Sequence, residues 1–363
     1  MENLGMIDTA NFWQGKRVLL TGHTGFKGSW LAIWLQQLGA EVVGIALAPN
    51  TMPNLFDLAH VKSGMTSHFC DIRNVTKMVQ IVRDACPEIV FHLAAQPLVR
   101  ASYRDPLATY ATNVMGTANL LDALRGLDSV KVAVMITTDK VYCNNEWNYP
   151  YRETDALGGH DPYSASKAAT ELVTSSFISS YFSDLTTTNP IRVSSARAGN
   201  VIGGGDWAQD RLIPDILNAF EQGRKVAIRN PYAIRPWQHV MEPLCGYLTL
   251  AELLFAHGPS FGEAWNFGPN DEDAKSVEWI VKEMALLWGA DAQWQVDPGE
   301  HPHEAHYLKL DISKARSRLD WRPALRLEES LSLIIEWSKQ FSAGTNMRQL
   351  TLDQIQYYQS ISK

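Results

Sequence analysis

The chain has 363 residues, of which 45% are apolar and 20% charged, and its formal net charge is −7. This length and composition predict a globular protein with room for two domains of roughly 150 residues each. The negative charge argues against a general nucleic-acid binder. The N-terminal residues lack a signal-peptide pattern, and no apolar run reaches about 18 residues. We therefore expect no nucleic-acid partner, no membrane span and a cytoplasmic location.

The four cysteines are widely scattered and form no Cys-x-x-Cys pair. They are Cys70, Cys86, Cys143 and Cys245. This spacing favours reduced thiols over a disulfide framework or a zinc site, and we expect no metal.

The first predicted elements form a strand, turn, helix and strand. Residues 17–20 (RVLL) form the predicted first strand, and residues 21–28 (TGHTGFKG) form a glycine-rich turn. A helical pattern follows at 29–40, and a second apolar run at 41–46 (EVVGIA) has the composition of a strand. This order is that of a βαβ unit.

Two further strands are expected at 89–93 (IVFHL) and 132–137 (VAVMIT), each after a helical stretch. Such alternation predicts the α/β class, with a Rossmann-like, doubly wound parallel sheet whose ligand lies beyond the carboxyl ends of the strands. The pattern loosens afterwards, which indicates a smaller mixed α/β lobe. We predict a nucleotide-binding domain over 1–198 and a substrate lobe over 199–363. A segment near 240–268 is a candidate to return to the first domain.

The glycine turn departs from the common Gly-x-Gly-x-x-Gly fingerprint, because its glycines stand at Gly22, Gly25 and Gly28. Between a strand and a helix, such glycines let backbone amides approach a pyrophosphate. A helix-capping loop without a ligand is the alternative. No acid stands at the end of the second strand to bind a ribose, so NAD and NADP both stay open. His23 and Lys27 are read either as phosphate or ribose contacts or as solvated side chains.

Tyr163 and Lys167 lie four residues apart in a helical stretch and so share one face. A cation beside a phenol lowers its pKa, and the phenolate can then take a proton from an alcohol while hydride leaves the same carbon. Tyr-x-x-x-Lys alone is a weak motif. Here it follows a glycine turn and a strand that ends in TTDK.

These three features, in this order, resemble the extended short-chain dehydrogenase/reductase family, whose glycine motif is TGxxGFxG. The resemblance implies NAD as the cofactor. It also implies a cofactor site made of the turn, an adenine-contacting segment, a loop near the cofactor, an asparagine that supports the Tyr-Lys pair, and that pair. The residues concerned are Gly22, His23, Thr24, Gly25, Phe26, Lys27, Gly28, Asp71, Ile72, Leu93, Ala94, Ala95, Asn113, Tyr163 and Lys167.

Thr138, Asp139 and Lys140 stand where this family varies its chemistry. The motifs TTDKVY, RAGNVIGGGDW, RPWQHVMEPL and HPHEAHYLKLD look like those of the branch that dehydrates CDP-D-glucose. The resemblance implies oxidation at carbon 4, loss of water across carbons 5 and 6, and hydride return to carbon 6, in deoxyhexose biosynthesis for lipopolysaccharide O-antigen. Asp139 is then a protonated acid. Lys140 is either a neutral base or a charged group that stabilises the enolate.

Donors for the substrate are expected mainly in the second lobe. The implied substrate-binding residues are Gln96, Asn200, Arg211, Arg235 and His303. Arg235 is favoured for the phosphates. We expect a homodimer or homotetramer. Another nucleotide-sugar 4,6-dehydratase, an epimerase, and a cofactor-binding protein without catalysis are the competing interpretations. Because no acid closes the second strand, we expect NAD to be held more loosely than in relatives that have one.

Overall fold

A computed structural model describes residues 9–183, 190–289, 292–297, 299 and 307–362. Its centre is a seven-stranded sheet in the order β11-β6-β5-β4-β1-β2-β3, in which every pair of neighbours is parallel. In chain order the strands are β1 (Arg17–Thr21), β2 (Glu41–Ala46), β3 (Thr66–Phe69), β4 (Ile89–His92), β5 (Val132–Ile136), β6 (Arg192–Ala198) and β11 (Ala264–Phe267). The predicted Rossmann-like α/β class is confirmed.

The strand order reverses direction at β1, because β2 and β3 follow on one side and β4 to β6 on the other. The carboxyl ends of β1 and β4 therefore flank a crevice where an open parallel sheet binds its ligand. Oγ1 of Thr21, at the end of β1, lies within hydrogen-bond distance of Nδ1 of His92, at the end of β4, at 2.7 Å.

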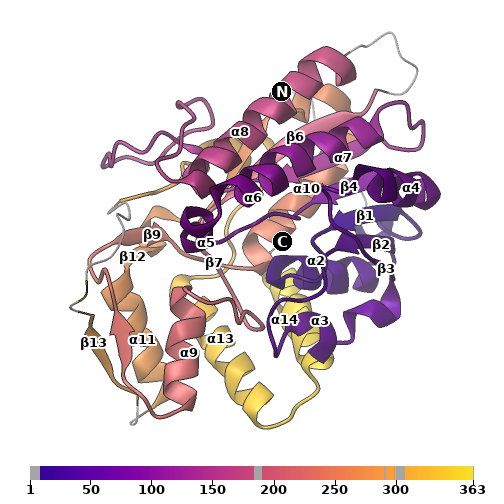
Figure 1. Ribbon diagram of the computed structural model, residues 1–363. Helices are drawn as coiled ribbons and strands as arrows, with labels where there is room; N and C mark the ends of the chain where they lie inside the picture. The colour runs from indigo at the N-terminus through magenta and orange to yellow at the C-terminus, as the bar shows by residue number, and fades with distance from the viewer. Residues whose placement is uncertain (1–8, 184–189, 290–291, 298, 300–306, 363) are drawn as a thin grey trace.

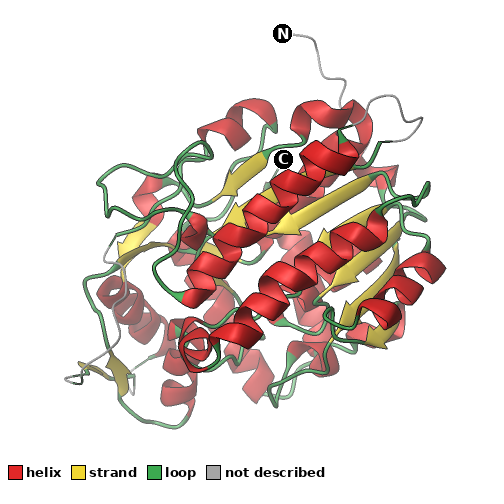
Figure 2. Ribbon diagram, turned by 45° about the horizontal axis from the view of Figure 1, so that its top comes forward, coloured by secondary structure: helices red, strands yellow, loops and turns green. Residues whose placement is uncertain are grey.

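Alternate residues of the strands face two different helix layers. Val18 and Leu20 pack with α2 (Phe26–Gln37) and α10 (Met241–His257), whereas Leu19 packs with α4 (Val75–Ala85) and α7 (Gly116–Leu124). Figure 2 shows long helices crossing one face of the sheet. This alternation is the period-2 pattern of a strand buried on both sides.

The remaining helices of the first part of the chain lie in the connections between these strands, except α1, which precedes β1. They are α1 (Thr9–Phe12), α3 (Leu55–Leu58), η1 (Val61–Gly64), α5 (Val99–Arg104), α6 (Pro106–Tyr110), η2 (Ala111–Met115), η3 (Asp139–Val141), α8 (Pro162–Phe177) and η4 (Ile178–Phe182).

The second lobe has its own apolar core and only short strand pairs. Its elements are β7 (Val201–Ile202), α9 (Leu212–Glu221), β8 (Val226–Ile228), β9 (Ile234–Pro236), β10 (Gln238–His239), η6 (Asp271–Asp273), β12 (Ala274–Ser276), α11 (Val277–Trp288), β13 (Trp294–Val296) and α13 (Leu327–Ser342). Two further short helices, η5 (Gly258–Phe261) and α12 (Ser313–Arg318), pack into the core around the central sheet instead. In Figure 1, α9, α11 and α13 gather at the side of the molecule away from β1 to β3. Their buried faces form one cluster around Ile216, Ile280 and Ile334.

The last helix, α14 (Met347–Ile361), turns back to the first part of the chain. It lies beside α2 and α3 in Figure 1, and the rings of Tyr358 and Trp34 meet edge to face at 5.8 Å. Chain that follows the second lobe therefore completes the core around the central sheet, as α10 and β11 also do. The predicted division at residue 198 stays a prediction.

The described residues contain no helix that is both long and apolar enough to cross a bilayer.

Candidate active site

The glycine turn leads from β1 into α2 and lies against the strand end of β4. Gly22 has a φ of +79°, and a Cβ built on it would stand 2.8 Å from the amide nitrogen of Ala94. A Cβ on Gly28 would stand 2.0 Å from the Gly22 carbonyl oxygen. Both positions therefore require glycine for close packing of turn, strand and helix.

Gly25 plays a different part, because a Cβ there would meet only the Gly22 oxygen, at 3.5 Å. It precedes α2, which begins without a side-chain cap. Uncapped helix amides and an open glycine backbone make a cradle for an anion. The turn thus fits the pyrophosphate of a dinucleotide.

The two chargeable residues of the turn point to different places. His23 is fully buried behind the turn, where its Nε2 lies 2.7 Å from Ser67 Oγ, and burial lowers its pKa to about 4. The interpretation of its side chain as a cofactor contact is therefore wrong, since it does not reach the pocket. Lys27 lines the pocket, and its amine donates to Tyr247 Oη at 3.3 Å. Burial, with the nearby Lys167 cation, lowers the pKa of Lys27 to about 7.

The adenine end of the crevice is lined by the predicted segments. Asp71 and Ile72 face the pocket, as do Leu93, Ala94 and Ala95 after β4. The Asp71 carboxylate accepts three hydrogen bonds from the Arg73 guanidinium at 2.6–3.0 Å, which hold the pKa of Asp71 below its usual range. The residues 46–50 that follow β2 also line the pocket, and Asn50 is their one polar side chain.

Tyr163 and Lys167 lie on α8, which begins with an Asp161 side chain that accepts from the Ser164 amide. Tyr163 lines the pocket, and the Lys167 amine donates to the Ile136 carbonyl at the end of β5, at 2.9 Å. Burial raises the pKa of Tyr163 to about 12, although a hydrogen bond with Thr138 opposes it. Burial also lowers the pKa of Lys167 to about 8. Burial is thus the main cause of the raised pKa of Tyr163, and the Thr138 hydrogen bond and the nearby Arg211 cation oppose it.

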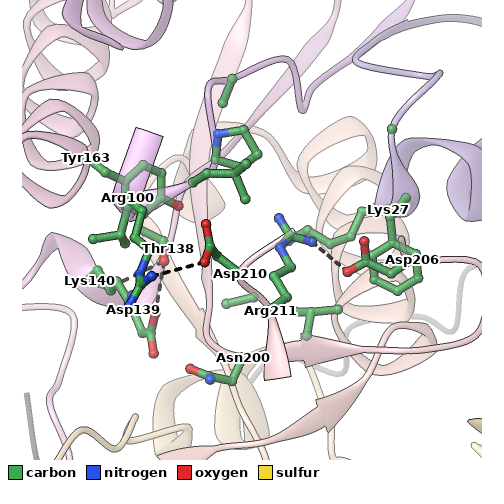
Figure 3. Close-up of a pocket in the computed structure, with 18 of the residues that line it drawn as sticks. Lys27, Arg100, Thr138, Asp139, Lys140, Tyr163, Asn200, Asp206, Asp210 and Arg211 are labelled. Carbon is green, nitrogen blue, oxygen red and sulfur yellow. Dashed lines mark hydrogen bonds and ion pairs between the residues drawn. The ribbon is translucent and has the colours of Figure 1, made fainter. Parts of the chain in front are cut away.

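Thr138, Asp139 and Lys140 follow β5 and open a short 3₁₀ turn, η3. The Thr138 hydroxyl donates to Asp139 Oδ1 at 2.9 Å, and Oδ2 of Asp139 is buried without a hydrogen-bond partner among the residues that the structure describes. Burial raises the pKa of Asp139. Protonation of this carboxyl is therefore easier than in water, although the Lys140 and Arg235 cations and the Thr138 hydrogen bond oppose the shift. Figure 3 shows these three residues together, with Tyr163 beside them.

The side chains of two predicted contacts lie behind the lining of the cavity. Asn113 is buried in the π-helical η2 segment, where it accepts from the Gln96 amide and donates to the Gln96 carbonyl and to Ser166 Oγ. The side-chain nitrogen of Gln96 donates to the Leu98 carbonyl and to Thr109 Oγ1, and its side-chain oxygen accepts from the Leu98 amide. Neither side chain lines the pocket. Asn113 thus contacts α8 beside the Tyr-Lys pair, as expected of an asparagine that supports this pair, and it also positions the loop after β4. The contact of Asn113 with the cofactor and that of Gln96 with the substrate stay predictions.

The second lobe closes the other side of the pocket. Asn200, Arg211 and Arg235 line it, and the Arg211 guanidinium donates to Asp206 at 2.7 Å. Arg235 lies on β9 and is largely buried. His303 lies outside the described residues. The lining groups named above surround one continuous cavity of about 770 Å³ that reaches from the glycine turn to α9 and β8, and His23, Gln96 and Asn113 are not among them.

Several polar residues of the cavity were not predicted. They are Arg100, Asp206, Asp210, Asp215 and Arg229. Arg100 follows LAAQPLV one helical turn beyond the β4 loop, and its place after a strand end is a signal that could have found it. The aspartates lie in irregular chain or at a helix start, where sequence carries no such signal.

A parallel sheet with a strand-order switch, a glycine turn at that switch and a Tyr-x-x-x-Lys helix beside a second lobe define the extended short-chain dehydrogenase/reductase class. A family model described as GDP-mannose 4,6 dehydratase matches residues 19–334. The chain belongs to this family of nucleotide-sugar enzymes.

Individual relatives agree with this assignment. The CDP-glucose 4,6-dehydratase of Salmonella typhimurium strain LT2 is 54% identical over 356 residues, which are 98% of this chain and 99% of that protein. The structure of UDP-glucose 4-epimerase from Thermotoga maritima with UDP-glucose superposes with a TM-score of 0.78 at 24% identity, over 90% of this chain and 99% of that one. The NAD complex of dTDP-glucose 4,6-dehydratase from Bacillus anthracis gives 0.73 at 21% identity, over 91% and 99%.

Proposed function

We propose that this chain is an NAD-dependent lyase that converts CDP-D-glucose to CDP-4-dehydro-6-deoxy-D-glucose and water. The observation that carries the proposal is the buried Asp139, whose free Oδ2 lies at the end of β5 beside Lys140 and close to Tyr163. A simple 4-epimerisation needs no such acid. The 54% identity with a CDP-glucose 4,6-dehydratase, over almost the whole of both chains, supports the substrate.

The cofactor residues follow from the crevice at the strand-order switch. The turn from Gly22 to Gly28 and the start of α2 would hold the pyrophosphate, and Asp71 and Ile72 would border the adenine. NAD, when bound, supplies the acceptor for the hydride of carbon 4 and the donor for its return to carbon 6. Tyr163 takes the proton of the 4-hydroxyl, and Lys167 supports the phenolate from the adjacent turn of α8.

The ketone at carbon 4 acidifies the hydrogen on carbon 5. Lys140 removes this proton if its amine is neutral. If the amine is charged, Lys140 stabilises the enolate and a base elsewhere in the cavity takes the proton. Asp139 gives its proton to the departing 6-hydroxyl, which leaves as water. Thr138 fixes the position of the carboxyl through the hydrogen bond to Oδ1.

The nucleotide half of the substrate would lie in the second lobe. Arg235 and Arg211 are the donors proposed for the diphosphate, with Asn200 next to them along the cavity wall. His303 stays a predicted contact. We also propose a cytoplasmic homodimer or homotetramer that supplies a deoxyhexose precursor for lipopolysaccharide.

The test is incubation with CDP-D-glucose and NAD, followed by the ultraviolet absorbance that 4-keto-6-deoxy sugars develop in base. Parallel reactions with dTDP-glucose, UDP-glucose and GDP-mannose decide the nucleotide. Lys140→Ala should lose net dehydration but retain partial oxidation of the sugar. Formation of the 4-epimer, or full dehydration by Lys140→Ala under saturating substrate, would contradict the proposal.

A further inference from the structure

One aspartate in the cavity is shared by two arginines from different parts of the chain. Arg100 belongs to α5, after β4 of the central sheet, whereas Asp210 lies in the connection between β7 and α9. Nη1 of Arg100 stands 3.3 Å from Oδ1 of Asp210, and Nη1 of Arg229, just after β8, stands 3.6 Å from the same oxygen. Figure 3 shows Arg100 and Asp210 pointing toward one another across the pocket.

The backbone at Asp210, which places the carboxylate between the two arginines, has an uncommon conformation. Asp210 has a φ of +61°, in the left-handed region that non-glycine residues rarely adopt. The next residue, Arg211, is itself paired with Asp206 at 2.7 Å. The second guanidinium nitrogen of Arg229 stands 3.8 Å from Asp215.

Three arginines and three aspartates of this region thus offset one another's charge inside the cavity. A diphosphate brings about two negative charges and needs the same guanidinium groups. The side chains of Arg100 and Asp210 keep 31% and 33% of their exposure. An ion pair with this much solvent exposure is weak, and each side chain can readily take another partner. A guanidinium and a phosphate, in contrast, can form a bidentate contact.

We propose that Asp210 sets the affinity for the diphosphate by occupying Arg100 and Arg229 until the phosphates displace it. Arg100 and Arg229 are then substrate contacts in addition to Arg211 and Arg235. Binding would transfer both guanidinium groups from the carboxylate to the phosphates, and Arg100 would link the sheet side of the cavity to the ligand. The identity of the nucleotide sugar rests on the proposed function, but the competition for the arginines does not.

Asp210→Asn is the sharpest test, because asparagine tolerates the left-handed conformation and keeps the side-chain shape while it removes the charge. Calorimetric titration should give a Kd for inorganic pyrophosphate, and for CDP, about three- to ten-fold lower than in the unmodified protein. The Kd for cytidine, which has no phosphates, should not change. Asp122→Asn is the matched control, since Asp122 pairs with Arg125 on the exposed surface at 2.7 Å.

Two further variants keep the result decisive. Asp210→Gly also removes the carboxylate, suits a φ of +61° and must act in the same direction. Arg100→Gln should weaken pyrophosphate binding, and adding Asp210→Asn to it should give a smaller gain than in the unmodified background.

An unchanged or weaker pyrophosphate affinity in both Asp210 variants would overturn the proposal. Absence of CDP-D-glucose turnover in the unmodified protein would instead contradict the proposed function, and the pyrophosphate titration would still decide the role of Asp210.

Discussion

Replacement of Asp139 by asparagine separates elimination from oxidation. In the unmodified protein Asp139 is buried, its Oδ1 accepts from Thr138 at 2.9 Å, and its Oδ2 has no partner. Asparagine has the same shape and can still accept from Thr138, but it has no acidic proton to give. The change therefore removes the proposed acid with little disturbance of the turn after β5.

The size of the effect follows from the role of the lost group. A positioned general acid contributes about 10²- to 10⁴-fold to a rate, so turnover of CDP-D-glucose by Asp139→Asn should fall within that range. Oxidation at carbon 4 uses Tyr163 and should continue. Rapid mixing of the variant with NAD and substrate should thus give a burst of reduced nicotinamide absorbance that decays slowly.

Asp84→Asn serves as the control, because Asp84 lies on the exposed side of α4, where it accepts from Gln80 at 2.9 Å. Turnover within three-fold of the unmodified rate for Asp139→Asn, or loss of the oxidation burst together with turnover, would refute the assigned role.

Three other predictions test the oxidation step, the affinity for NAD and the stability of the fold. Tyr163→Phe should remove both the burst and turnover, by about 10²-fold or more, and a burst of normal size would contradict the base role. Added NAD should raise the activity of purified protein, because no acid follows β2; stoichiometric NAD that survives exhaustive dialysis would contradict this. Burial raises the pKa of Glu242 from its ordinary 4.5 to about 7. A carboxyl whose pKa is higher in the folded chain than in the unfolded chain stabilises the fold at pH values below the unfolded pKa of 4.5. This stabilisation is lost as the pH rises through the folded pKa of about 7. The free energy of unfolding of Glu242→Gln, relative to that of the unmodified chain, should therefore rise by about 1–3 kcal/mol from pH 4 to pH 8 in thermal unfolding. The same difference between the two proteins at both pH values would contradict this prediction.

The sequence predicted the sheet well where hydrophobic runs are long and continuous. The strand expected at 41–46 matches β2, and those expected at 89–93 and 132–137 are each one residue longer than β4 and β5. Buried parallel strands have such runs because both faces pack against helices. The return of α10, β11 and α14 to the central core depends on contacts between residues far apart in the chain, which a local pattern does not carry.

The site shows the same division between local and distant information. Gly22, Gly25 and Gly28 lie where their spacing indicated, since a strand-turn-helix is a local structure. His23 was misplaced because the direction of a side chain depends on what packs behind it, here Ser67. A local pattern also does not show how deeply Tyr163 is buried, and this burial raises its pKa.

The cavity aspartates, together with Arg100 and Arg229, were missed for a related reason. Asp206 and Asp210 stand in irregular chain, and only the folded structure brings Asp210 to Arg100, 110 residues away. A charge in a loop is usually solvated, so sequence alone gives such residues no priority.

The most direct measurement of the central claim uses CDP-D-glucose that carries deuterium on carbon 4. Internal redox moves the hydride from carbon 4 to carbon 6, so nuclear magnetic resonance and mass spectrometry should find CDP-4-dehydro-6-deoxy-D-glucose with the deuterium on carbon 6. Recovery of a 4-epimer, of unreacted substrate, or of a dehydrated product without the deuterium would contradict the account.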